Sequence, residues 1–129
     1  MDQIEKIFYR VYDQLGYGLS EKAYQTAIML ELGALNFNAE EEVKIVQKYT
    51  TSTGLTCVIS MLRMDIKVTD PDIIIELKTI KSELDLEFGC KELVQLERYM
   101  KLSGIENGFL VNFNIDNLQI IRVEKNKTE

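Results

Sequence analysis

Two segments near the N-terminus place apolar residues at the spacing of an amphipathic helix. The first predicts a helix over about residues 3–15 that ends at Gly16. Its apolar positions are Ile4, Ile7, Phe8, Val11 and Leu15. A second helix is expected to begin near Ser20, whose hydroxyl can cap it, and to run toward the break at residues 36–38. Its predicted apolar stripe is Ala23, Ala27, Leu30 and Ala34.

The pattern then changes to one that is typical of strands. Segments at about 41–49 and 55–68 are rich in β-branched residues, and a third resumes at Ile73. A turn at residues 51–54 and a break at Asp70–Pro71 separate them, which predicts a three-stranded meander. Residues 88–103 predict a third helix, with Leu96 and Met100 on its apolar face and Gly104 as its stop. Two strands follow, at about 108–113 and 118–123.

This order of elements predicts one α+β domain, with helices against a sheet, over residues 1–123. Residues 124–129 read as a polar C-terminal tail. A chain of 129 residues, 46% of them hydrophobic, is long enough to bury a core and to carry one site.

Composition removes several classes of chemistry. The chain has no His, which excludes serine or cysteine nucleophiles paired with imidazole and metal sites with His ligands. Acidic residues outnumber basic ones 21 to 15, for a net charge of −6, which argues mildly against nonspecific nucleic-acid binding. Cys57 and Cys90 are expected to be small core residues. No signal-peptide or membrane-span pattern occurs, so we expect a soluble, intracellular (cytoplasmic) protein without a membrane partner.

The predicted hairpin around Asp70–Pro71 carries the most informative charges. Two registers, in which facing residue numbers sum to 141 or to 143, keep its apolar residues on one face. These are Met64, Ile66, Val68, Ile73, Ile75 and Leu77. The other face collects Arg63, Asp65, Lys67, Asp72, Ile74, Glu76 and Lys78. In the 141 register Asp65 faces Glu76 and Arg63 faces Lys78, whereas in the 143 register Lys78 faces Asp65 as an ordinary ion pair.

Like charges that face each other across a ladder cost free energy. A divalent cation between Asp65 and Glu76 would remove that cost, because Mg²⁺ takes one or two carboxylates together with water and phosphate oxygens. Lys78 follows on the same face, close enough to orient a metal-bound water. The alternative is a solvated face with ion pairs. Asp72 is a poor ligand candidate, because four residues along one strand separate it from Glu76 by roughly 13 Å.

Several motifs resemble one branch of the PD-(D/E)XK nuclease superfamily, the GxxExxY proteins. Gly18-Leu19-Ser20-Glu21-Lys22-Ala23-Tyr24 matches the motif that names the branch. Asp65, followed by Ile75-Glu76-Leu77-Lys78, is similar to the catalytic hairpin of the superfamily. Residues 95–104, QLERYMKLSG, resemble the Q-L-x-x-Y-L-K-L-T-G helix, and residues 108–113, GFLVNF, resemble its closing strand.

This resemblance implies a restriction-endonuclease-like fold and a metal-dependent nuclease that acts on DNA or RNA with Mg²⁺ or Mn²⁺. It implies that Asp65 and Glu76 are metal ligands, that Glu21 lies near the metal as a further ligand, and that Lys78 is the catalytic lysine. Gln95 and Tyr99 would line the site. The alternatives are an ordinary first-turn carboxylate for Glu21, a half-buried polar stripe for Gln95 and Tyr99, and core packing for Tyr24.

Two rival functions stay open at this stage. The first is a noncatalytic module that keeps the fold and binds a protein or nucleic acid. The second is a structural subunit with a merely solvated charged face, which requires the 143 register. The oligomeric state is not indicated.

Overall fold

A computed structural model describes residues 2–86 and 89–125. Its elements follow the predicted order of two helices, three strands, one helix and two strands. They are α1 (Asp2–Leu15), α2 (Glu21–Ala34), β1 (Asn38–Thr50), β2 (Thr56–Thr69), β3 (Ile73–Lys78), α3 (Lys91–Ser103), β4 (Asn107–Phe113) and β5 (Leu118–Glu124). The predicted tail begins with Glu124, which is the last residue of β5, and residues 126–129 lie outside the described residues.

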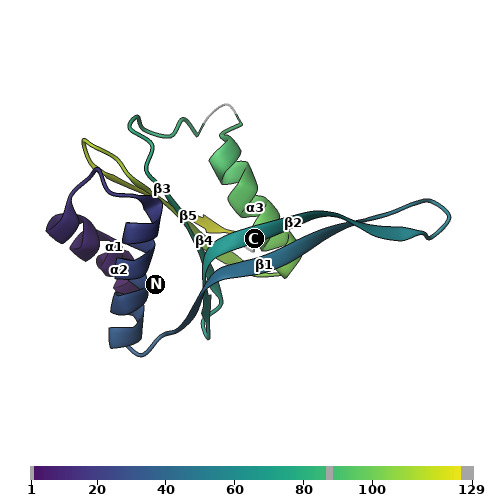
Figure 1. The fold of residues 1–129 in the computed structure, drawn as a ribbon, viewed down its shortest axis with the longest axis horizontal. Helices are drawn as coiled ribbons and strands as arrows, with labels where there is room; N and C mark the ends of the chain where they lie inside the picture. The colour runs from purple at the N-terminus through teal and green to yellow at the C-terminus, as the bar shows by residue number, and fades with distance from the viewer. Residues whose placement is uncertain (1, 87–88, 126–129) are drawn as a thin grey trace.

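The five strands form one mixed sheet in the order β1-β2-β3-β4-β5 (Figure 1). Neighbouring strands are antiparallel except β3 and β4, which are parallel and are joined by the crossover that contains α3. A parallel pair requires such a crossover, because a tight turn cannot connect two strands that run in the same direction. Figure 1 shows α1 and α2 on one side of the sheet and α3 on the other. The predicted α+β architecture is therefore confirmed.

The helix ends follow local chemistry. Ser20 caps α2, because its side chain accepts a hydrogen bond from the Ala23 N–H at 3.1 Å, as predicted. Gly104 ends α3 in the left-handed conformation, with φ 77°. The α3 helix begins at Lys91, later than predicted, and Phe88 lies outside the described residues.

The apolar stripe predicted for α2 is wrong. The helix buries Tyr24, Gln25, Ile28 and Leu32, whereas Leu30 is 72% exposed. Tyr24 is a core residue, as its packing alternative predicted: its ring stacks on Phe113 at a centroid distance of 4.0 Å. Its hydroxyl donates to the Gly16 carbonyl at 2.7 Å, which ties the loop before α2 to the core.

Two hydrophobic clusters fill the two sides of the sheet. The first joins α1 and α2 to residues such as Ile66, Ile75 and Phe109, and the second lies under α3. Both faces of β3 are buried, so Ile74, predicted on the charged face, packs under α3. Met64 was predicted to share the face of Ile66, but it also packs in the second cluster. Figure 1 shows that the hairpin of β1 and β2 bends along its length.

Beyond the bend, β1 and β2 continue away from the sheet as a two-stranded hairpin, whose outer part (residues 46–61) we call the arm. The predicted turn at its tip is present, since the Gly54 N–H donates to the Thr51 carbonyl at 3.1 Å. Cys57 lies exposed on the arm, so its prediction as a core residue was wrong, and Cys90 is half-buried. None of the helices in the described part of the chain is long and apolar enough to cross a membrane.

Candidate active site

The site lies where β2 and β3 separate. Their ladder holds three pairs, Ile66 with Ile75, Lys67 with Ile74 and Val68 with Ile73, which is the 141 register. The 143 register, and with it the ordinary pairing of Lys78 opposite Asp65, is excluded. The ladder stops before Asp65 and Glu76, and the two carboxylates take the place of the next backbone hydrogen bonds.

Each of the two carboxylates is fixed by the opposite strand. The backbone N–H of Asp65 donates to Glu76 Oε2 at 2.9 Å, and the backbone N–H of Leu77 donates to Asp65 Oδ2 at 2.8 Å. These reciprocal bonds hold the acid groups face to face, and they fix side chains on rigid strands rather than on loops. The local sequence therefore builds a pair of opposed carboxylates directly into the sheet.

Burial makes this pair electrostatically costly. Glu76 is only 3% exposed, and burial together with the nearby Asp65 charge raises its pKa from 4.5 to about 8. Burial also raises the pKa of Asp65, against the opposing effect of its hydrogen bond from Leu77. The pair therefore shares a proton near neutral pH unless a cation compensates the second negative charge.

The remaining oxygens of the pair fit a divalent cation. All fully buried side-chain oxygens and nitrogens of the described residues have a hydrogen-bond partner. Within the same residues Asp65 Oδ1 and Glu76 Oε1 accept no protein hydrogen bond, so both reach solvent. Two carboxylate oxygens with room for water match the ligand set that Mg²⁺ prefers.

Glu21 does not complete a three-carboxylate cage. Residues 2–86 and 89–125 contain no group of three Asp, Glu or Cys side chains that is close enough to hold a metal ion. Glu21 lies exposed in the first turn of α2, but its charge contributes to the raised pKa of both Asp65 and Glu76. The charge of Glu21 therefore reaches the pair from the first turn of α2.

The other three predicted residues also gather at the pair. The Lys78 ammonium lowers the pKa of both carboxyl groups, yet it forms no ion pair within 4 Å among the described residues. Tyr99 of α3 is buried, and burial, Glu76 and Asp65 raise its pKa to about 12. Gln95, half-buried one turn earlier, hydrogen-bonds to the Tyr99 side chain. Tyr99 therefore keeps its proton at neutral pH, close enough to both carboxylates for their charges to raise its pKa.

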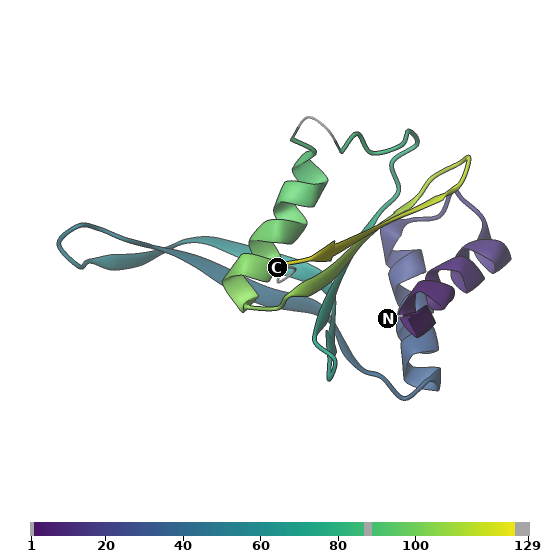
Figure 2. The ribbon, with the colours of Figure 1, turned by 180° about the vertical axis from the view of Figure 1, so that it is seen from behind.

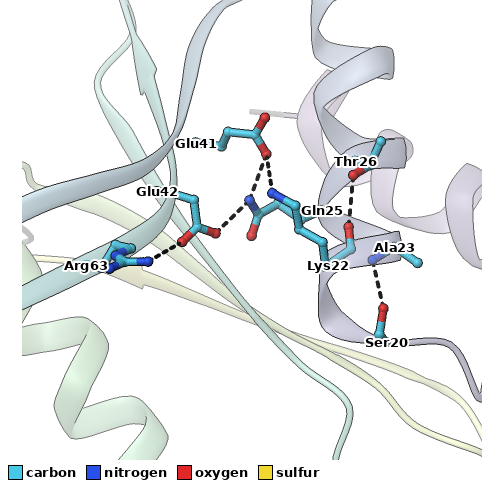
Figure 3. A network of polar contacts seen from close by, with 8 residues as sticks. All are labelled: Ser20, Lys22, Ala23, Gln25, Thr26, Glu41, Glu42 and Arg63. Carbon is cyan, nitrogen blue, oxygen red and sulfur yellow. Dashed lines mark hydrogen bonds and ion pairs between the residues drawn. The ribbon is translucent and has the colours of Figure 1, made fainter.

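A second polar network, which the sequence does not predict, links α2 to β1 and β2 (Figure 3). Buried Gln25 donates from Nε2 to Glu41 Oε1 at 2.8 Å and to Glu42 Oε2 at 2.9 Å. Arg63 donates to the other oxygen of Glu42 at 3.4 Å. Glu42 has φ 56° and a charge that raises the pKa of Asp65. Glu41 and Glu42 thus tie the bend of β1 to α2, whereas Glu40 is exposed.

Two further expectations for this region differ from the structure. Arg63 does not face Lys78, because the β2–β3 ladder ends first and Lys78 pairs with Asn112 of β4. Asp72 lies exposed in the turn before β3 and accepts a hydrogen bond from the Asp70 N–H at 3.2 Å. Asp72 therefore does not share a strand with Glu76, contrary to the expectation.

The chain is similar to known proteins in sequence and in fold. The family model of the PD-(D/E)XK nuclease superfamily matches residues 1–123. A chain in the crystal structure of SSO0001 is similar, with 27% sequence identity and a TM-score of 0.57. The match covers 82% of this chain and 53% of that chain, so this chain spans about half its length. None of the curated proteins compared with the sequence matches it. The chain belongs to the PD-(D/E)XK nuclease superfamily.

Proposed function

We propose that the protein is a metal-dependent nuclease that hydrolyses phosphodiester bonds in DNA or RNA, with residues 1–123 as the catalytic unit. The observation that carries the proposal is the opposed pair of Asp65 and Glu76, held face to face by reciprocal hydrogen bonds. Such a pair is unfavourable in a merely structural sheet, because its buried negative charges repel. Superfamily membership supports a nucleic-acid substrate.

Asp65 and Glu76 would hold Mg²⁺ or Mn²⁺ through the oxygens that accept no protein hydrogen bond. When bound, the ion supplies Lewis-acid stabilisation of a phosphoryl oxygen and lowers the pKa of a coordinated water. Glu21, at the edge of the pair, would hold an ion-bound water rather than the ion itself. Water and the substrate phosphate would supply the remaining ligands of the ion.

The neighbouring side chains have separate roles in this proposal. Lys78 would orient the attacking water and stabilise the negative charge that develops on the phosphate, since its ammonium is not engaged by an ion pair. Tyr99 would donate a hydrogen bond from its protonated hydroxyl. Gln95 would position Tyr99 through the hydrogen bond between their side chains.

We also assign the chain to the GxxExxY branch. The packing of the naming motif supports this assignment, because Tyr24 anchors the segment and the charge of Glu21 raises the pKa of Glu76. The tyrosine of the motif thus acts through the position of Glu21, and it contacts no reacting group itself.

The test is a cleavage assay with single- and double-stranded DNA and RNA, with Mg²⁺ or Mn²⁺ and with chelator. We expect metal-dependent cleavage that is lost in Asp65→Asn and Glu76→Gln, and kept in Asp13→Asn, a control at an exposed carboxylate of α1. Unchanged cleavage in Asp65→Asn would reject the site. Nucleic-acid binding without cleavage under all conditions would favour the noncatalytic module.

A further inference from the structure

The arm leaves the body of the protein without support. Figures 1 and 2, seen from opposite sides, both show it extending well beyond the helices. Ile45 and Leu62, at its base, still pack on the cluster under α3. In the described part of the chain, neither core cluster includes a residue of the arm itself.

Both edges of the arm are unpaired. β1 is the edge strand of the sheet, and β2 pairs with β3 only at residues 66–68. Over residues 46–61 the described chain therefore offers two strands that bond only to each other. An isolated two-stranded hairpin is marginally stable in water, whereas three or more strands with a shared apolar surface are stable.

The side chains of the arm are apolar and exposed. The most exposed are Leu55 at 72%, Met61 at 64%, Tyr49 at 60% and Ile59 at 59%. Val46 and Val58 add to this surface. Residues 46–61 carry one charge, Lys48, in a chain that is 28% charged overall. Uncharged strand edges with large exposed apolar residues are templates for pairing with another strand.

We propose that the arm is a self-association surface, on which the arm of a second copy of this chain pairs in antiparallel orientation about a two-fold axis. A two-fold pair is favoured because an antiparallel strand edge is complementary to itself. Pairing makes a four-stranded ribbon out of two marginal hairpins. The six apolar side chains expose about 500 Å² per chain, of which edge pairing brings only a part against the partner, so the pair belongs with weak, concentration-dependent interfaces.

The distribution of charge favours a second copy over nucleic acid. A nucleic-acid surface needs clustered Lys and Arg, and the arm has Lys48 alone. All 21 acidic residues lie outside residues 43–64, so the bodies of two copies repel and contact between the arms, far from the bodies, is preferred. Salt screens this repulsion. Association through the arms should therefore tighten or stay constant as salt increases.

Sedimentation velocity of the full chain tests the proposal at loading concentrations from about 1 to 200 µM, a range suited to an interface of this size. We expect a concentration-dependent dimer of twice 14.9 kDa. Met61→Glu and Met61→Lys should each raise the dissociation constant about tenfold or more, because both copies then carry the same charge on neighbouring strands of the ribbon. Leu30→Glu, a matched control on exposed α2 surface, should leave the dimer intact.

A second readout uses the native cysteines and does not need a variant to fold. Alkylation of Cys57 on the arm should slow as the protein concentration increases, while alkylation of Cys90 stays constant. A monomer at every concentration would overturn the proposal. It would also be overturned by a dimer that resists both Met61 variants, or by one that Met61→Lys strengthens and salt weakens. The last result would indicate that the arm binds an acidic surface or a polyanion.

Discussion

Replacing Glu76 by Gln should stabilise the metal-free protein at pH 8, although it removes a proposed metal ligand. The pKa of Glu76 is raised from 4.5 to about 8, chiefly by burial and then by Asp65. A carboxyl group with a raised pKa binds its proton more tightly in the folded state than in the unfolded one. Folding stability therefore falls as the pH rises from about 4.5 to about 8.

The size of the effect follows from the pKa. One pKa unit corresponds to about 1.4 kcal/mol, so a fully ionised Glu76 lowers the free energy of unfolding by up to about 5 kcal/mol. About 2 kcal/mol of this loss falls between roughly pH 6 and pH 8. Gln keeps the shape and an acceptor for the Asp65 N–H, and it does not ionise. For a domain of this size, about 2 kcal/mol corresponds to a difference in melting temperature of roughly 5–10 °C.

The assay is thermal or urea unfolding of both proteins in chelator at several pH values. We expect the free energy of unfolding of Glu76→Gln to exceed that of wild type by a growing amount as the pH rises. Saturating Mg²⁺ at pH 8 should raise the free energy of unfolding of wild type more than that of the variant. A constant separation of the two unfolding curves from pH 6 to pH 8 would show that burial beside Asp65 does not raise the pKa of Glu76.

Three further outcomes are expected. Lys78→Met should lower single-turnover cleavage by about 100-fold or more but leave stabilisation by Mn²⁺ intact, because its ammonium acts on the reaction and not on the cation. Gln25→Leu should lower the free energy of unfolding in urea by about 1–3 kcal/mol, because two carboxylates at the bend of β1 lose their donor. Gly108→Ala should lower the free energy of unfolding by about 1–3 kcal/mol, since the Cβ of the alanine would lie 3.0 Å from two side chains of α3. Gly33→Ala in α2, which meets nothing within 4 Å, should instead be neutral or stabilising by up to about 1 kcal/mol.

The parts of the fold that the sequence predicts are those where periodicity and burial agree. A shift of the β2–β3 register by one residue would turn Ile66 and Ile75 to the wrong face, so the apolar pattern limits the possibilities to two registers. The structure selects the 141 register. Asp65 and Glu76 could be found because their spacing across a turn defines their opposition. The reciprocal hydrogen bonds of these two residues could not be predicted from the sequence, because the bonds form only where β2 and β3 separate.

The parts that failed depend on long-range packing. In α2, small and apolar residues occur around the whole helix, so the sequence alone does not show that Tyr24 and Ile28 face the sheet while Leu30 faces solvent. The prediction of Cys57 as a core residue rested on the average behaviour of cysteine. Cys57 is instead exposed, because the arm does not pack against either core cluster. The hydrogen bond from Gln25 to Glu42 joins α2 to β1, and only the complete fold brings these two elements together.

The central claim is that Asp65 and Glu76 together bind one divalent cation, and Mn²⁺ titration followed by electron paramagnetic resonance tests it most directly. At pH 8 we expect saturable Mn²⁺ binding to wild type. Below about pH 8 binding should weaken and release a proton, because ionisation of Glu76 must precede coordination. Asp65→Asn and Glu76→Gln should each abolish this binding. Equal Mn²⁺ affinity in wild type and both variants would contradict the account.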